Sequence, residues 1–211
     1  LVPMFFPILG AQVSETEFQY PDLSWKELCG MMGNLVADSG CNKGQLSNIV
    51  EAICHNLREH DNTELEKLVE WQKQMKTKSA NKEKPARPDV SFWFPPADVT
   101  NAAFIQNAMT CEKLGGRTQY LNLPEVEMAD RMCGGHKQIS QMLRNIYDRQ
   151  RSGALRATAE GVTGNPVLRA NLTISSTPYA ARKFYKNELF NGTFGRMVFS
   201  YKARQGREGK I

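Results

Sequence analysis

The apolar positions of this chain form two patterns that alternate along its length. Continuous apolar or β-branched runs of strand length stand beside segments whose apolar residues recur every three or four positions. The predicted strands lie within residues 27–40, 90–96, 117–127, 153–162, 166–178 and 195–203. The predicted helices cover residues 43–60, 63–78, 97–116, 135–150 and 179–190. Because strands alternate with helices, the pattern predicts an α/β fold with a mainly parallel central sheet flanked by helices.

The length and the polar stretches predict how the chain is divided. With 211 residues, of which 41% are hydrophobic and 23% charged, the chain can form one domain with a core of ordinary size. Residues 1–30 form a mixed lead-in, and the polar stretch 79–89, which contains two prolines, predicts a mobile surface loop. The opening run LVPMFFPILGA is too short to span a bilayer. Since the chain begins at Leu1 without an initiator Met, we expect a fragment of a longer protein.

Cysteine usage and charge narrow the class of protein. The five cysteines form no CxxC pair and no spacing typical of a zinc site, which indicates reduced thiols in a cytoplasmic protein. Residues 131–211 contain 15 Lys and Arg against 4 Asp and Glu, whereas residues 1–70 contain 4 against 11. A basic last third suits a polyanion such as DNA, although a solvated face balanced by the acidic first third is an equally good interpretation.

One segment, NLVADSGCNKGQL at residues 34–46, has the strand, loop and helix order of a phosphate-binding loop. Set against the pattern GxxxxGK[ST], Ala37 takes the first glycine, Asn42 the second, Lys43 the lysine and Gly44 the hydroxyl residue. Only the lysine is retained, but Gly40 and Asn42 both tolerate the backbone turns that such a loop needs. The alternative interpretation is an ordinary turn from a strand to a helix.

Three later segments carry residues that would complete such a site. In YLNLPEVEMAD, Glu125 and Glu127 are expected to alternate on one strand and to offer a magnesium ligand and a group that polarises water, although solvated acids at a strand end are the commoner case. The strand NLTISSTP ends in Ser176 and Thr177, which could sense a γ-phosphate. Arg196 follows a glycine-rich turn and could serve as an arginine finger toward a neighbouring subunit.

As an ordered set, these segments resemble a known family. The segments follow one another as in the P-loop ATPase domain of the primase-helicase-like proteins of phages, plasmids and Bacteroides-type conjugative transposons, which are related to AAA+ ATPases. In chain order, they are GNLVADSGCNKGQL, PPADVTNAAFIQNA, GGRTQYLNLPEVEMAD, IYDRQRSGALRATAEGV, PVLRANLTISSTPYAARKFY and GTFGRMVFSY. The resemblance implies a P-loop NTPase fold, binding of ATP and Mg²⁺, and a helicase-like role in replication or mobilisation of a mobile element. The first motif departs most from the family pattern, through Asn42 and Gly44, and this puts hydrolysis in doubt more than the fold.

The resemblance also implies roles for individual residues. It places the phosphates against a set of loop residues: Ala37, Gly40, Asn42, Lys43, Gly44 and Gln45. It implies that Glu125 holds the metal with Glu127 beside it, that Ser176 or Thr177 is the sensor, and that Arg196 acts on a neighbouring copy in a homo-oligomer. The residues expected to face DNA, single-stranded above all, are Arg144, Arg149, Arg151, Arg156, Arg182, Lys183 and Lys186. The alternatives are a non-catalytic nucleic-acid-binding module that keeps the fold and a structural assembly module.

Overall fold

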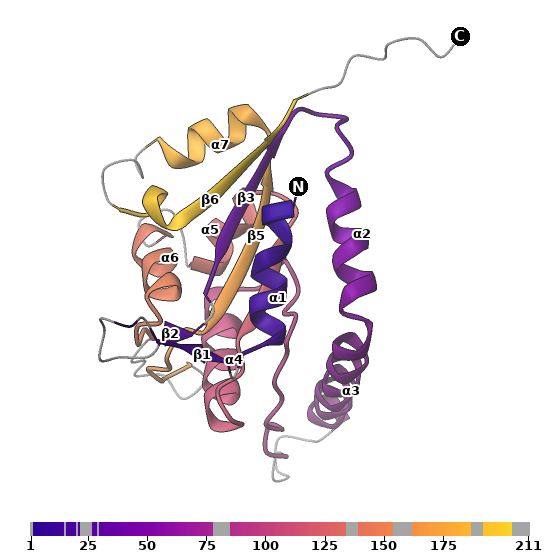
Figure 1. Cartoon of the computed structure of the whole chain (residues 1–211). Coiled ribbons are helices and arrows are strands. Elements are labelled where there is room, and N and C mark those ends of the chain that lie inside the picture. Colours follow the sequence, from indigo (N-terminus) through magenta and orange to yellow (C-terminus); the bar gives the residue numbers. More distant parts are fainter. Residues whose placement is uncertain are drawn as a thin grey trace.

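The centre of the molecule is a sheet of four parallel strands (Figure 1). The computed structural model of the chain describes residues 2–14, 16–19, 21, 27–28, 30–77, 85–133, 139–153, 162–186 and 192–203. The strands are β3 (Met32–Ala37), β4 (Gln119–Leu123), β5 (Ala170–Ser176) and β6 (Met197–Lys202), in the order β4-β5-β3-β6. All seven residues of β5 are buried, and its apolar residues, Ala170, Leu172 and Ile174, alternate with buried polar ones.

Helices cover both faces of this sheet, so the predicted α/β class is confirmed. One face carries the 3₁₀ helix η1 (Val2–Phe5), α1 (Phe6–Gln12) and α2 (Gly44–Ile53), where Met4, Leu35 and Leu46 pack together. The larger core lies on the other face, beneath α4 (Asn101–Lys113), α5 (Glu127–Cys133), α6 (Ile139–Tyr147) and α7 (Pro178–Tyr185). The small elements are the antiparallel pair β1 (Glu17–Phe18) and β2 (Glu27–Leu28) and the 3₁₀ helix η2 (Phe194–Arg196).

The apolar opening of the chain belongs to the core. Met4 and Ile8 are fully buried, and two polar side chains of β5 bond to carbonyls of this segment: Asn171 Nδ2 donates to Pro7 O (2.9 Å) and Thr173 Oγ1 to Met4 O (3.3 Å). Residues 2–12 therefore cover a face of the sheet that would otherwise expose polar strand residues beside apolar ones. Within the described ranges, every helix is too short or too polar to cross a membrane.

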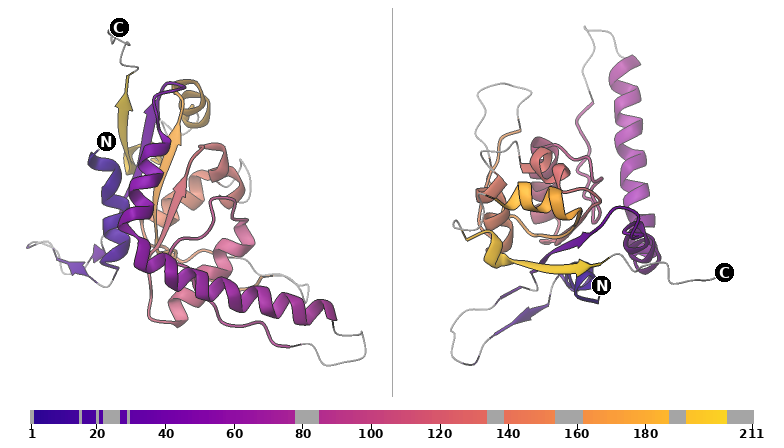
Figure 2. Two further views of the ribbon diagram at one scale, coloured as in Figure 1. Left: turned by 90° about the vertical axis from the view of Figure 1, so that its right-hand side faces the viewer. Right: turned by 90° about the horizontal axis from the view of Figure 1, so that it is seen from above.

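The helix predicted over residues 43–60 is two helices. It ends at Ile53, and after Cys54 the chain continues as α3 (His55–Thr77), which changes direction and extends away from the sheet (Figures 1 and 2). No Gly or Pro marks this break in the sequence. The change of direction carries Asp61 and Glu64 of α3 to the backbone of residues 91–94.

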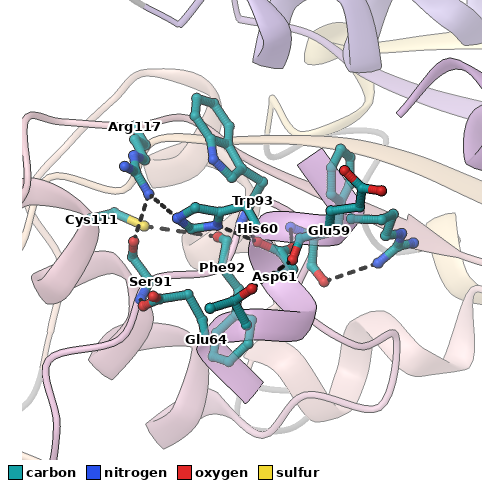
Figure 3. A network of polar contacts seen from close by, with 12 residues as sticks. Glu59, His60, Asp61, Glu64, Ser91, Phe92, Trp93, Cys111 and Arg117 are labelled. Atoms are coloured by element: carbon teal, nitrogen blue, oxygen red, sulfur yellow. Dashed lines mark hydrogen bonds and ion pairs between the residues drawn. The ribbon is translucent and has the colours of Figure 1, made fainter. Parts of the chain in front are cut away.

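The strand predicted over residues 90–96 is wrong. This segment is extended, and Tyr120 N donates to Trp93 O (2.7 Å), but it does not join the sheet. Side chains take most of its backbone groups instead (Figure 3). Asp61 accepts hydrogen bonds from Trp93 N (2.9 Å) and Phe94 N (2.7 Å), and Asn107 of α4 both donates to and accepts from the backbone of Phe92.

Thr100 caps α4, its Oγ1 accepting a hydrogen bond from Ala103 N (3.3 Å). Two of the predicted segments lie partly outside the described residues. Of the predicted mobile loop 79–89, residues 79–84 lie outside the described residues. So do residues 154–161 of the predicted strand 153–162.

Candidate nucleotide site

The predicted phosphate loop lies at the point of the sheet where connections diverge. β3 and β5 are neighbours, and their carboxyl ends lie at the same edge. The helix that follows β3, α2, packs on the α1 face, whereas the helix that follows β5, α7, packs on the opposite face. In open α/β sheets a crevice forms between two such strands, and ligands bind there.

The turn between β3 and α2 has the backbone conformation that its sequence favours. Gly40 has φ +79° and Asn42 has φ +55°, so both occupy the left-handed region. Lys43 precedes the first helical residue with helical backbone angles, and no side chain caps α2. The first turn is closed by two backbone bonds, from Gln45 N to Asn42 O (3.3 Å) and from Leu46 N to Lys43 O (3.1 Å).

Lys43 is folded back on this turn. Its Nζ donates to Ala37 O, at the end of β3, over 3.2 Å. Gly44 and Gln45 are exposed, and a Cβ placed on Gly44 would meet no atom within 4 Å. The helix N-terminus is therefore open on this side, and the ammonium group lies across the loop that leads to it.

The hydroxyls of the two predicted sensor residues are bonded within the chain. Thr177 Oγ1 accepts from Ala180 N (3.2 Å) and so caps α7. Ser176 is buried, and its Oγ donates to Asn34 Oδ1 (2.8 Å). Asn34 in turn donates through Nδ2 to Tyr185 Oη (2.8 Å), which links β3, β5 and α7. The sequence analysis missed Asn34, although a lone amide within the otherwise apolar run MGNLVA signals a buried polar role.

Glu125 and Glu127 are placed differently from the prediction. β4 ends at Leu123, Pro124 stops the strand, and Glu127 is the first residue of α5. The alternation of the two glutamates on one strand is therefore wrong, because one lies in a turn and the other on a helix. Both side chains are exposed, and β5 separates β4 from β3 in the sheet.

A contact between α2 and β4 connects the two halves of the candidate site. Asn122 Nδ2 donates to Ser47 Oγ (2.9 Å), one turn into α2. Both residues line a cavity of about 220 Å³ together with Glu51, whose carboxylate accepts from Arg58 Nε (2.9 Å). The Ser47 hydroxyl is thus held by β4.

Arg196 and the phosphate loop lie at opposite ends of the parallel strands. The loop follows β3, at the carboxyl ends, and Arg196 directly precedes β6, at the amino ends. Its Nε and Nη2 each lie 2.9 Å from an oxygen of Asp148, and this hydrogen-bonded pairing, together with the negative charge of Asp148, raises the pKa of the guanidinium. Within its own subunit, Arg196 therefore cannot reach the loop, and a contact with a neighbouring subunit would compete with Asp148.

Among the described residues, the basic side chains expected to face DNA are of two kinds, some bonded within the chain and some exposed. Arg149 donates to Asn171 Oδ1 (2.8 Å) and Ala170 O (3.3 Å) at the start of β5, and Arg151 pairs with Glu112 (2.9 Å). Arg144 donates to Gln141 (3.0 Å) on its own helix, and Arg156 lies outside the described residues. Arg182, Lys183 and Lys186 are exposed on α7.

The other polar cluster, in Figure 3, is built for structure. Arg117 Nη1 donates to Ser91 Oγ (2.9 Å) and contacts His60 Nε2 (3.1 Å), whose Nδ1 faces Asp61 (3.2 Å). Ser91 is fully buried, so this hydroxyl cannot meet a substrate. Burial alone would raise the pKa of Glu64, but hydrogen bonds from Lys67 and from Ser91 N outweigh it, and the pKa is lowered.

Burial makes two of the cysteines, Cys54 and Cys111, poor nucleophiles. Burial raises the pKa of Cys54 to about 11 and that of Cys111 to about 12, so both stay protonated at neutral pH. Among the described residues, His, Cys, Asp and Glu nowhere gather in the groups of three that a metal ion needs.

Comparison of the chain with protein-family models, curated proteins and solved structures finds no match.

Proposed function

We propose that this chain binds ATP at the turn between β3 and α2 and works as a P-loop-type, helicase-like module on DNA. The observation that carries the proposal is the uncapped start of α2, beside Lys43, at the point where the helices after β3 and β5 diverge. A helix N-terminus with free space around it and an adjacent ammonium group favours a phosphate chain. The lysine has only to exchange the carbonyl of Ala37 for a phosphate oxygen.

The fit to the two parts of Mg-ATP is unequal. Phosphate oxygens would find the backbone N–H of Gly44 and a charge at Lys43, whereas the N–H of Gln45 would have to leave Asn42 O. Mg²⁺ would find no hydroxyl at Gly44, while Ser47 is held by Asn122, so Glu125 is the ligand that we propose for it, with Glu127 close by in sequence. The proposal therefore extends to nucleotide binding and derives no hydrolytic step.

The biological setting rests on the resemblance of the ordered motifs to phage, plasmid and transposon primase-helicases. On that basis we propose replication or mobilisation of a mobile element, with DNA as partner and a homo-oligomer as the working form. Arg196 would then leave Asp148 to act on a neighbouring copy.

Calorimetric titration of ATP, with and without Mg²⁺, tests the nucleotide site. We expect binding by the unaltered chain and loss of binding in Lys43→Ala. Lys76→Ala is a matched control, because Lys76 is an exposed lysine in the last turn of α3. Absence of heat in all three folded proteins, or equal binding by Lys43→Ala, would refute the proposal.

A second function is favoured by a specific observation. Gly44 stands where the pattern requires a hydroxyl, and Pro124 stands at the end of the strand that should carry the acidic ligand. A non-catalytic nucleic-acid-binding or assembly module that keeps the fold would show these losses. Oligonucleotide binding that ATP does not alter, or oligomerisation without any ligand, would favour it.

A further inference from the structure

A second candidate site lies between α7 and β6, on the face of the sheet opposite to α2. A cavity of about 340 Å³ is lined by Val36, Ala181, Arg182, Tyr185, Lys186, Phe194 and Phe199. This volume falls in the range of small-ligand pockets, about 300–1,000 Å³. Figure 1 shows α7 and β6 next to each other at one side of the sheet, with β6 at the edge.

The walls of the cavity are aromatic. Phe194 and Phe199 are stacked, with ring centroids 4.5 Å apart and planes inclined by 26°. Tyr185 meets Phe199 edge to face at 5.1 Å, and its hydroxyl is held by Asn34, so the ring is fixed in place. Phe194 remains 39% exposed, which leaves part of a flat apolar surface open to a ligand.

The rim of the cavity is cationic. Tyr179, Arg182, Lys183 and Lys186 follow one another at helical spacing along the exposed side of α7, while Ala181 and Tyr185 face inward. Residues 178–186 and 192–203 contain no Asp or Glu, and within the described part of the chain Arg182, Lys183 and Lys186 make no ion pair. The surface therefore carries positive charge that no described carboxylate offsets.

We infer that this α7–β6 groove binds single-stranded nucleic acid, with phosphates along the basic side of α7 and an unpaired base against Phe194. Proteins that bind single strands combine a positively charged groove, which follows the phosphate backbone, with aromatic rings on which the bases stack. A duplex does not offer a free base for the pocket. The inference rests on the proposed function only for the class of partner; it needs neither ATP nor Lys43.

Fluorescence anisotropy with a labelled oligothymidine, in the absence of nucleotide, tests the groove. An abasic strand of equal length has the same phosphates and no bases, so we expect it to bind about tenfold more weakly. Phe194→Leu should weaken oligothymidine binding to the abasic level and leave abasic binding unchanged, whereas Phe194→Trp should retain it. Phe6→Leu, at an exposed phenylalanine of α1, is the matched control.

The charge contribution has its own measurement. Lys183→Ala should lower the slope of log affinity against log salt by about one, and Lys76→Ala should leave it unchanged. Because Lys183 is exposed, this arm holds even if Phe194→Leu does not fold.

Three results would overturn the inference: no oligothymidine binding, equal binding of the abasic strand, or equal competition by polyglutamate, which would indicate an acidic peptide instead. Lys43→Ala separates this inference from the nucleotide site. If ATP binding is absent while oligothymidine binding is intact and sensitive to Phe194→Leu, the proposed function fails and the groove stands. If ATP binds and oligothymidine does not, the reverse holds.

Discussion

Two turns at the same edge of the sheet lead from neighbouring strands into helices, and they end very differently. After β5, Thr177 adopts an extended conformation and its hydroxyl accepts a hydrogen bond from Ala180 N, so α7 is capped by its own chain. After β3, Lys43 is already helical, no side chain caps α2, and two residues of the turn have positive φ. Helix starts leave backbone N–H groups without intrahelical partners, and side chains, water or ligands supply them.

The difference separates structure from binding. The Thr177 end uses its polar groups to hold the fold, as the Thr100 end of α4 also does. The Lys43 end has no side-chain cap and places Gly40 and Asn42 in the left-handed region, which is the pattern expected where a ligand completes the site. Changes at the closed turn should therefore alter stability, and changes at the open turn should alter nucleotide binding.

The largest effect is expected at Asn34, which ties β3 to the closed end of β5. Asn34→Leu would leave the buried Ser176 hydroxyl without its acceptor and Tyr185 without its donor, at a cost of about 2–4 kcal/mol in the free energy of unfolding. Urea denaturation measures it. Tyr185→Phe removes a single hydroxyl and should cost about 1 kcal/mol; equal costs would contradict the role of Asn34 as the shared partner.

The next effect is expected at the open turn. Gly40→Val places a β-branched residue at φ +79°, which should cost about 1–2 kcal/mol and remove ATP binding by distorting the loop. Asn42→Gly is the matched change, because glycine accepts φ +55° without strain, and ATP binding should persist. Urea denaturation measures the free energy of unfolding of each variant, and calorimetry measures its ATP binding. Retained ATP binding in a destabilised Gly40→Val would mean that the turn is not the site.

The closed turn gives the converse result. Thr177→Ala removes the cap of α7 and should lower the free energy of unfolding by about 1 kcal/mol without changing ATP affinity. Thr100→Ala, which removes the equivalent cap of α4, should behave alike. A loss of ATP affinity in Thr177→Ala alone would show that its hydroxyl reaches the nucleotide, and the contrast between the two turns would fail.

Sequence reasoning succeeded where the controlling contacts are local or uniform. The strands at 119–123, 170–176 and 197–202 lie within predicted runs, because each carries the apolar, aromatic and β-branched residues that favour strands. The glycine turn before α2 was also predictable, since Gly40 and Asn42 are the residue types that adopt positive φ.

It failed where partners come from distant segments. Residues 90–94 have strand composition, but their N–H groups are taken by Asp61, Glu64 and Asn107, which no local pattern reveals. The misplacement of Glu125 and Glu127 was avoidable, because Pro124 is a strand-ending signal. Asn34 was missed because its role depends on Tyr185, 151 positions further along the chain.

The smallest stability effect carries the sharpest test of the open turn. Gly44 is a helical residue with free space around it, so both Gly44→Ala and Gly44→Ser should stabilise the protein, by about 0.5–1 kcal/mol for alanine and less for serine. Only serine supplies the hydroxyl that a phosphate loop uses for Mg²⁺. Calorimetry should therefore show a larger Mg²⁺ dependence of ATP binding in Gly44→Ser than in Gly44→Ala. Identical Mg²⁺ dependence in the two variants would place the metal elsewhere and leave the turn with phosphate binding alone.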